Sequence, residues 1–344
     1  MMRTQATWWE RLRTNTLFWP LVALALVMVF NLLFTPNFFR LEIKDGHLFG
    51  SLVDVLNRGA PLMLMAVGLT AVIATAGVDL SVGAVAAICA AVATRLVGNV
   101  TDVTATPLPL VILVTLGVAI LCGLWNGLLV SRANIQPMVA TLVLMVAGRG
   151  IAQLITDGQI ITVYYPPFFY FGAGYLLGLP FTLFIVAAIF LFAWLMTRRT
   201  AIGLFVESVG TNASSSFFSG VNEKNIKLVA YIFCAFCAGI AGIIISSNVK
   251  SADANNVGLY MELDAILAVV IGGTLMSGGR FSLAGSVLGA LLIQSVTTTI
   301  YAFGVPPEVV LVVKSLVVLF VVLLYSEPMK LALDRLARRK GAQA

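Results

Sequence analysis

The sequence predicts an all-α polytopic membrane protein with about ten transmembrane helices and both termini on the cytoplasmic side. Hydrophobic residues make up 60% of the 344 residues and charged residues only 10%, whereas soluble domains carry roughly 25% charged residues. The apolar residues gather in ten separate stretches, and one membrane span needs about 20 mainly apolar residues. A chain with this balance cannot hide its apolar surface from water, so the bilayer is its expected solvent.

The predicted spans follow one another along the chain, each as a run of mainly apolar residues. They lie at residues 18–34, 59–76, 82–98, 108–130, 137–155, 181–197, 228–248, 263–277, 283–303 and 308–325. The shortest, 263–277, is expected to be bent or extended into its flanks. The chain therefore divides into an N-terminal cytoplasmic segment 1–17, one transmembrane domain 18–325 that contains a polar loop 198–227, and a basic cytoplasmic tail 326–344.

The first span has the basic start and the apolar run of a signal peptide. The residues that follow it, Thr35-Pro36-Asn37-Phe38, are not a small-residue cleavage site. An uncleaved first span is therefore the favoured interpretation.

Basic residues set the orientation, because cytoplasmic loops are rich in lysine and arginine. With the N-terminus inside, the cytoplasmic side receives Arg3, Arg11, Arg13, Arg132, Arg198, Arg199, Lys224, Lys227, Arg280, Lys330, Arg335, Arg338, Arg339 and Lys340. The opposite side receives Arg40, Lys44 and Lys250 together with Glu42, Asp45, Asp102, Asp157, Asp253 and Glu262. The net charge of +6 thus reflects topology and does not indicate nucleic acid. The basic tail is expected to lie against anionic headgroups.

The cysteines and the single histidine give little indication of a redox or metal site. Cys89, Cys122, Cys234 and Cys237 all fall within predicted spans, where buried packing is favoured over a redox or metal role for the C-x-x-C pair. His47 is expected on a solvated outer loop with no second ligand nearby. We predict neither a disulfide nor a metal site.

The apolar pattern breaks at residues 75–83, where two glycines, a serine and Asp79 stand between the second and third spans. Non-helical backbone at membrane depth survives only where protein or a water-filled cavity covers it. Asp79 has two interpretations: it caps the next helix, or it lines a pathway. Both predict that alanine is not tolerated.

Arg149 is the second break, because a charge in a span is costly. It either faces the bundle and finds a partner there or extends toward the outer interface. Further polar side chains on or near spans are Asn126, Gln136, Gln153, Asp264 and Gln294. Some are expected to bond between helices, and a subset facing one another would suit a hydroxyl-rich solute.

The polar loop 198–227 reads as two short helices. Ile202, Phe205, Val206 and Val209 have helical spacing and predict the apolar stripe of the first. Gly210 is expected as its C-cap. Asn212 is expected to cap a second helical turn that carries Phe217 and Phe218 and ends at Gly220. Two phenylalanines on a short cytoplasmic helix need a cover, either the underside of the membrane domain or a cleft in a soluble partner.

Several enzyme classes lack their residues in this sequence. There is no G-x-x-x-x-G-K-[ST], so the glycine-rich run 272–279 is not a phosphate loop. No Ser/His/Asp set appears either. Active transport would therefore draw on another polypeptide or on an ion gradient.

Four motifs occur in order: GVDLSVG at 77–83, QPMVATL at 136–142, AGRG at 147–150, and IGG at 271–273 with GGR at 278–280. Together they resemble the monosaccharide ABC importer permeases of the ribose/xylose/galactoside group, over nearly the whole chain. The segments KDGHLFGS at 44–51, VLNR at 55–58, ADANN at 252–256 and LDAILAVV at 263–270 are similar to permeases of bacterial galactofuranose importers.

This resemblance implies ten spans in the type II importer arrangement, in a bacterial inner membrane. It also implies the partners: a second homologous permease, a cytoplasmic ATPase with two nucleotide-binding halves, and a periplasmic sugar-binding protein. ATP and magnesium would bind to the ATPase, and this chain would need no cofactor of its own. The solute would be a neutral monosaccharide, galactofuranose or a related sugar.

The resemblance identifies residues 202–221 as the ATPase-coupling segment. Glu207, Gly210, Asn212, Gly220 and Val221 match the family pattern, whereas Ser215, Ser216 and Phe217 depart from it. The expected coupling residues are Ile202, Phe205, Glu207, Gly210, Asn212, Phe217, Phe218 and Gly220.

Two further sets complete the predicted sites. Asp79, Asn126, Arg149 and Asp264 are expected in the solute path or its gate. Asp253, Asn255 and Asn256 either receive the binding protein or form a polar turn between spans.

Three other functions remain open. A gradient-driven secondary transporter would also have broken spans and polar groups at the midplane. A branched-chain amino-acid ABC permease would share the architecture but carry a zwitterion. A membrane enzyme is the third, although no catalytic set can be named.

Overall fold

A computed structural model describes residues 17–44, 46–98 and 106–325. Ten of its helices correspond to the ten predicted stretches: α2 (Phe18–Phe34), α3 (Ser51–Ala74), α4 (Val82–Val97), α5 (Leu108–Ser131), α6 (Pro137–Ile155), α8 (Phe181–Arg199), α11 (Glu223–Val249), α12 (Met261–Ile271), α13 (Leu283–Ala302) and α14 (Pro307–Tyr325). The predicted terminal segments 1–17 and 326–344 lie outside the described residues, except for residue 17. The charged residues in these segments therefore lie outside them too, as do Asp45 and Asp102.

The helical membrane architecture is confirmed at the level of length and composition. Within the described residues, six helices are long and apolar enough to cross a membrane: α3, α5, α6, α8, α11 and α13. Helices α2 and α4 are apolar but shorter. That all ten cross the membrane stays a prediction.

Three predicted boundaries are wrong by five or more residues. Helix α11 begins at Glu223 instead of residue 228. Helix α3 begins at Ser51, well before residue 59, because its first two turns carry polar residues such as Asp54 and Arg58 that lower the local hydropathy. Helix α12 ends at Ile271 instead of residue 277. Gly273 follows with φ +87°, a left-handed conformation that stops the helix.

Helix α11 forms the centre of the bundle and packs against α3, α4, α5 and α7 (Pro166–Ala173). Glycines let the backbones approach closely: a Cβ on Gly68 of α3 would lie 2.9 Å from the Cα of Cys234 on α11. Small residues make such contacts in membranes, where helices gain little from hydrophobic burial. Cys234 and Cys237 are buried and unpaired in this core, in agreement with a packing role.

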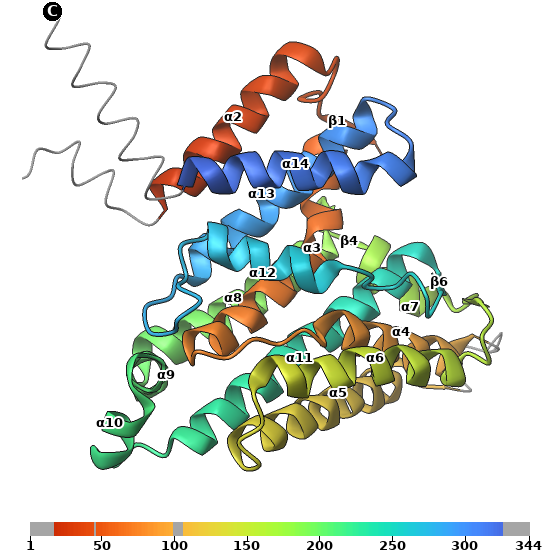
Figure 1. Ribbon diagram of the computed structural model, residues 1–344. Helices are drawn as coiled ribbons and strands as arrows, with labels where there is room; N and C mark the ends of the chain where they lie inside the picture. The colour runs from red at the N-terminus through yellow and green to blue at the C-terminus, as the bar shows by residue number, and fades with distance from the viewer. Residues whose placement is uncertain (1–16, 45, 99–105, 326–344) are drawn as a thin grey trace, which may run out of the picture.

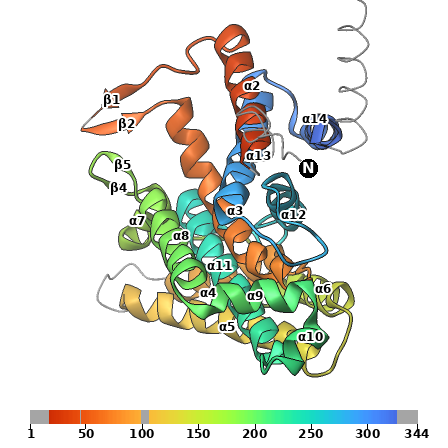
Figure 2. The same ribbon diagram turned by 90° about the vertical axis from the view of Figure 1, so that its left-hand side faces the viewer.

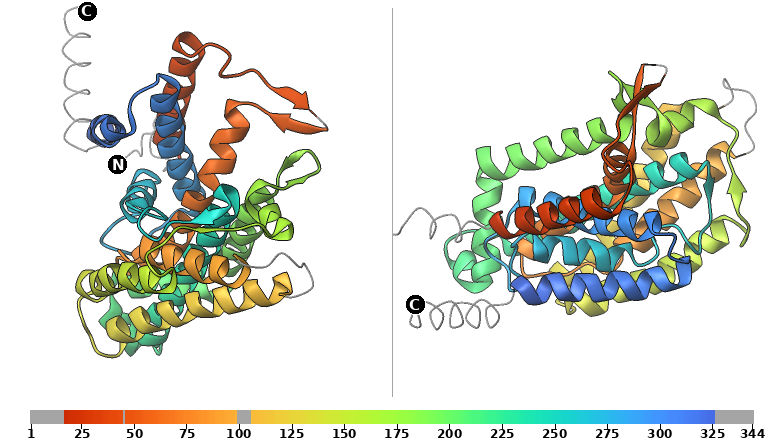
Figure 3. Two further views of the ribbon diagram at one scale, coloured as in Figure 1. Left: turned by 90° about the vertical axis from the view of Figure 1, so that its right-hand side faces the viewer. Right: turned by 90° about the horizontal axis from the view of Figure 1, so that it is seen from above.

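The molecule has two distinct ends along the direction of α8. Helices α9 (Ala201–Thr211) and α10 (Ala213–Phe218) follow α8 at one end, where α2 also begins and α14 finishes (Figures 1 and 2). Helix α7 lies at the opposite end with the strand pairs β3 (Ile161–Thr162) with β6 (Ser251–Ala252) and β4 (Tyr175–Leu176) with β5 (Leu179–Pro180). Helices α2 and α14 both pack against α13 at one edge (Figure 3).

A hairpin of β1 (Glu42–Lys44) and β2 (His47–Phe49) projects from the end that carries α7. A hydrogen bond from Lys44 and the charges of Lys44 and Arg40 lower the pKa of the Glu42 carboxyl. The ring of His47 is half-buried and stacks on Tyr175 at 4.4 Å. The predicted solvation of His47 is therefore only partial, because Tyr175 of β4 covers one face of its ring.

Candidate functional site

Helix α9 presents the predicted apolar stripe to the rest of the protein. Thr200 caps it by accepting a hydrogen bond from the backbone N–H of Ile202 at 3.2 Å. Val206 and Val209 are buried, Phe205 is half-buried, and Ile202 remains 38% exposed. The helix therefore lies along the bundle with one face still open.

The prediction for Gly210 is wrong: it lies inside α9, which ends at Thr211, and is not a C-cap. A Cβ on Gly210 would collide with the carbonyl oxygen of Ala74 and lie 2.5 Å from the backbone nitrogen of Gly279. The N–H of Gly279 donates to that same carbonyl at 2.9 Å. The glycine is thus needed for a three-way backbone contact between α9, the end of α3 and the 272–282 loop.

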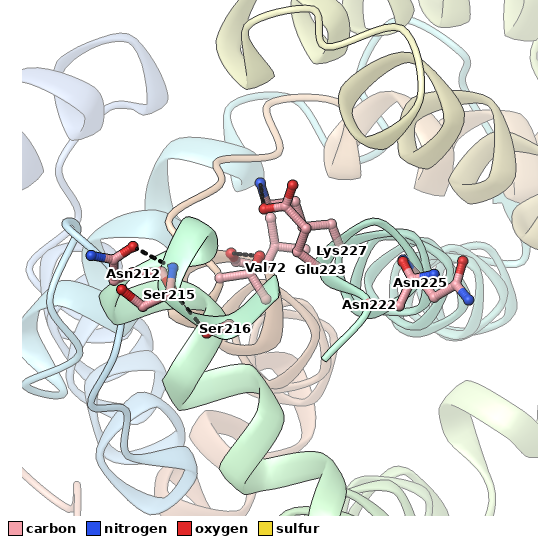
Figure 4. Close-up of polar contacts among 9 residues, drawn as sticks. Val72, Asn212, Ser215, Ser216, Asn222, Glu223, Asn225 and Lys227 are labelled. Atoms are coloured by element: carbon pink, nitrogen blue, oxygen red, sulfur yellow. Dashed lines mark hydrogen bonds and ion pairs between the residues drawn. The ribbon is translucent and has the colours of Figure 1, made fainter. Parts of the chain in front are cut away.

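Helix α10 confirms the predicted cap. The side chain of Asn212 accepts from the N–H of Ser215 at 3.0 Å (Figure 4). The buried hydroxyl of Ser216 lies 2.7 Å from that of Ser208 on α9. Gly220 follows the helix with φ +86°. The two short helices are thereby held together as one unit.

The two phenylalanines of α10 point away from the protein. Phe217 is 64% exposed and Phe218 is 88% exposed, and their rings contact each other edge to face at 5.9 Å. Of the two covers that the sequence allows, the underside of this chain is excluded. Glu207 on α9 is half-buried.

A cavity of about 350 Å³ lies behind this unit. Its walls come from the α3–α4 linker (75–81), the α5–α6 loop, α9 and α11, and include Gly77, Gln136, Gly210, Lys227 and Tyr231. Lys227 pairs with Glu223 one turn earlier at 3.6 Å (Figure 4). The α9–α10 unit therefore borders the irregular segment that contains Asp79.

The linker 75–81 runs back along the bundle, so α4 begins within the protein (Figure 1). Asp79 is 1% exposed, and its Oδ1 accepts from the N–H of Ser81 at 2.8 Å and from its hydroxyl at 2.6 Å. Asn126 of α5 donates to the Ser81 hydroxyl at 2.8 Å and lies 3.5 Å from the Asp79 carboxylate. Asp79 therefore stabilises the turn before α4 instead of capping α4, whose N-cap is Ser81.

Arg149 of α6 faces the bundle. Its Nη1 donates to the carbonyl of Val257 at 2.5 Å and to that of Ala254 at 3.4 Å. Both acceptors lie in the irregular segment 253–260, which leads into α12. Of the two interpretations of Arg149, the buried partner is confirmed, and the partner is backbone.

The two irregular segments meet at glycines. A Cβ on Gly258 would lie 2.6 Å from the carbonyl oxygen of Gly83, at the start of α4. A Cβ on Gly83 would in turn collide with a carboxylate oxygen of Glu262. Glu262 is 1% exposed, so its carboxylate is buried inside the bundle, while its predicted side of the membrane stays a prediction. Only tertiary packing reveals this, since Glu262 stands in the sequence just after a polar turn.

Asp253, Asn255 and Asn256 form a polar turn held by its own hydrogen bonds. Asp253 accepts from the N–H of Asn255 at 2.9 Å and from the side-chain amide of Asn256 at 2.6 Å. Asn255 accepts from Gln153 of α6 at 2.6 Å. A docking role for these residues stays a prediction.

Asp264 of α12 pairs with Lys314 of α14, and both side chains are mostly buried. Lys314 is not among the site residues predicted from the sequence. A lysine within a predicted span, combined with a carboxylate in another, was the available signal.

The predicted path residues therefore form three groups and not one site. Asp79 and Asn126 lie together, Arg149 binds the 253–260 segment, and Asp264 pairs with Lys314. The 253–260 segment and the adjoining α12 link the last two groups.

Comparisons with known proteins give a consistent result. The chain is 51% identical to the galactofuranose transporter permease protein YtfT of Escherichia coli (strain K12), covering 90% of this chain and 91% of the relative. It is 38% identical to the fructose import permease protein FruF of Bifidobacterium longum (strain NCC 2705), covering 87% and 84%. It is 34% identical to the ribose import permease protein RbsC of Escherichia coli (strain K12), covering 88% and 91%.

No solved structure matches the chain significantly. The family model described as branched-chain amino acid transport system / permease component matches residues 51–322, which span α3 to most of α14 and hold every predicted site residue. Together with relatives at this identity over most of their length, the match shows that the chain belongs to this family of transport-system permeases.

Proposed function

We propose that this chain is the membrane translocation subunit of an ATP-driven importer of a monosaccharide, with galactofuranose as the favoured sugar. The observation that carries the proposal is the 51% identity to a galactofuranose transporter permease over 90% of the chain. Relatives named as fructose and ribose import permeases support the wider class of monosaccharides. The protein lies in a bacterial inner membrane, with all ten helices spanning it and both termini in the cytoplasm.

A separate ATPase binds ATP and magnesium, docks on the α9–α10 unit, and supplies the free energy for transport. The exposed Phe217 and Phe218 support this contact, because such a pair is costly in water. Ile202, Phe205 and Glu207 of α9 are the further proposed coupling contacts, and each is at least partly exposed. A second, homologous permease completes the membrane part of the complex.

Movement of the α9–α10 unit reaches the path through backbone contacts. Gly210 lies against Ala74 and Gly279, so a shift of α9 displaces the end of α3 and the linker that follows it. That linker carries Asp79, which holds the start of α4. Asp79, Asn126, Arg149 and Asp264 thereby form the path or set the positions of its walls.

A periplasmic sugar-binding protein delivers the solute at the end opposite α9. Asp253, Asn255 and Asn256 are its proposed docking residues, since Asn255 and Asn256 are exposed there. Their turn joins β6 to α12, so a contact with it acts on the segment that Arg149 holds.

The test is uptake of labelled galactose by vesicles that contain the complete importer. We expect uptake that requires ATP and the binding protein and that persists when an ionophore removes ion gradients. Uptake that survives without ATP but collapses with the ionophore would support a secondary transporter instead. Competition by leucine but not by sugars would support the amino-acid function that the family description names.

A further inference from the structure

A cavity of about 340 Å³ opens between α3, α12, α13 and α14, and the segment 253–260 that Arg149 binds forms part of its wall. Its polar lining consists mainly of Arg58, Asn256, Asp264, Gln294, Tyr301 and Lys314. These side chains come from all four helices and from the 253–260 segment. Pockets for small molecules have volumes of about 300–1,000 Å³, so one monosaccharide fits in this space.

The lining lies at membrane depth on the side away from α9. Arg58 and Lys314 each stand seven residues into their helices, α3 and α14, which is about 10 Å from the helix start at 1.5 Å per residue. Charges at that depth are costly unless they pair or face a water-filled space. Arg58 is exposed, lines the cavity, and has no hydrogen-bond or ion-pair partner among the described residues.

The remaining groups supply the donors and acceptors that a ring of hydroxyls requires. Gln294 offers both kinds, and only its weak 3.3 Å contact to Thr298 occupies it. Tyr301 adds an aromatic ring that is 54% exposed. Hydrogen bonds from charged groups such as Arg58 are stronger than those between neutral groups.

The ion pair between Asp264 and Lys314 stands at the boundary of this cavity. Both residues also line a second, more apolar cavity of about 520 Å³ between α12 and α14. The two cavities share Leu259 as well. The pair thus separates two hollow spaces, and its two side chains are only 20% and 14% exposed.

We propose that the α3–α12–α13–α14 cavity is an intramembrane binding site for a monosaccharide, and that the Asp264–Lys314 ion pair is its gate. The inference rests on the proposed function and adds to it a defined site with named sugar contacts. Arg58 and Gln294 bind the hydroxyls, and opening of the ion pair lets the solute move on.

The first experiment measures access and occupancy with a single cysteine. Thr297 lines the cavity. In the complete importer, we expect Thr297→Cys to react with a membrane-impermeant maleimide and galactose to slow this reaction. Leu177→Cys, at a residue 87% exposed and outside the cavity lining, is the control, and its reaction should not respond to sugar. Adding Gln294→Leu should raise the galactose concentration needed for protection at least tenfold.

The second experiment tests the gate by efflux of preloaded galactose from vesicles without ATP. Asp264→Asn and Lys314→Met should each raise the rate of galactose efflux several-fold. The exchanged pair, Asp264→Lys with Lys314→Asp, should return the efflux rate to that of the unmodified importer. The exposed pair Arg95–Asp157, 3.1 Å apart, provides the control Asp157→Asn, which should not leak.

Different results would refute the proposed function, the sugar site and the gate. Absence of ATP-driven sugar uptake by the unmodified importer would refute the proposed function. If uptake occurs but galactose never protects Thr297→Cys, the cavity is not a sugar site. If protection occurs but Asp264→Asn is as tight as the unmodified protein, the ion pair is not the gate.

Discussion

At the scale of single residues, one tightly packed position is where two irregular segments cross. Gly83, in the first turn of α4, packs against the carboxylate of Glu262 and the carbonyl of Gly258. Gly258 has φ +65°, a conformation that favours glycine. The backbone there has no space for a methyl group, and Arg149 holds the same segment from the other side.

We therefore expect Gly83→Ala to destabilise the protein. Overpacking of a well-packed interior costs about 1–3 kcal/mol, which exceeds the gain of up to about 1 kcal/mol from placing alanine in a helix. The apparent melting temperature of the purified chain in detergent should fall by a few degrees. Gly117→Ala on α5 is the control, because nothing lies within 4 Å of its added Cβ, and it should leave the melting temperature unchanged or raise it. Equal changes in melting temperature for the two variants would contradict the close packing of Gly83 against Glu262 and Gly258.

At the scale of elements, the sequence predicted most helices because apolar length marks a span directly. It misplaced the start of α3, whose first turns carry polar residues such as Asp54 and Arg58 that line surfaces or cavities instead of facing lipid. It also misread Gly210, since a glycine near the end of an apolar stripe indicates either a C-cap or a close backbone contact. Only the position of Ala74 distinguishes these. The ion pair of Asp264 with Lys314 joins residues 50 positions apart, and helix packing alone brings them together.

The α9–α10 unit gives the prediction at this scale. Changing both Phe217 and Phe218 to Asp should abolish co-purification with the ATPase, because two charges would enter an apolar contact. The fold should survive, since both rings are largely exposed. The amount of folded permease, measured by size-exclusion chromatography, checks this point.

The matched control is Leu177→Asp, at a residue 87% exposed at the opposite end of α8. It introduces the same charge on an exposed apolar residue and should leave the ATPase bound. Retention of the ATPase by the double phenylalanine variant would place the coupling contact elsewhere on the chain.

At the scale of the whole molecule, the asymmetry of charge gives the protein a direction in the membrane. Arg198 and Arg199 end α8 on the side of α9, and Arg132 and Lys227 lie near the same end. Arg132 donates to Asn225 of α11 at 2.8 Å there. At the end with α7, the acidic Glu42 and Asp157 are offset by their basic partners Arg40, Lys44 and Arg95. The positive-inside rule then predicts that α9 and α10 lie in the cytoplasm.

This orientation predicts opposite labelling of two single-cysteine variants. Ser214→Cys on α10 is exposed beside α9, and Leu177→Cys is exposed at the other end of α8. Helix α8 has 19 residues, so at 1.5 Å per residue it separates the two positions by about the thickness of a bilayer core. A membrane-impermeant maleimide should label Leu177→Cys in spheroplasts and Ser214→Cys only in inverted vesicles. Three native cysteines are buried and the fourth is half-buried, so the unmodified protein provides a low background. Labelling of Ser214→Cys in spheroplasts would reverse the assigned direction and remove α9 and α10 from the reach of any cytoplasmic ATPase.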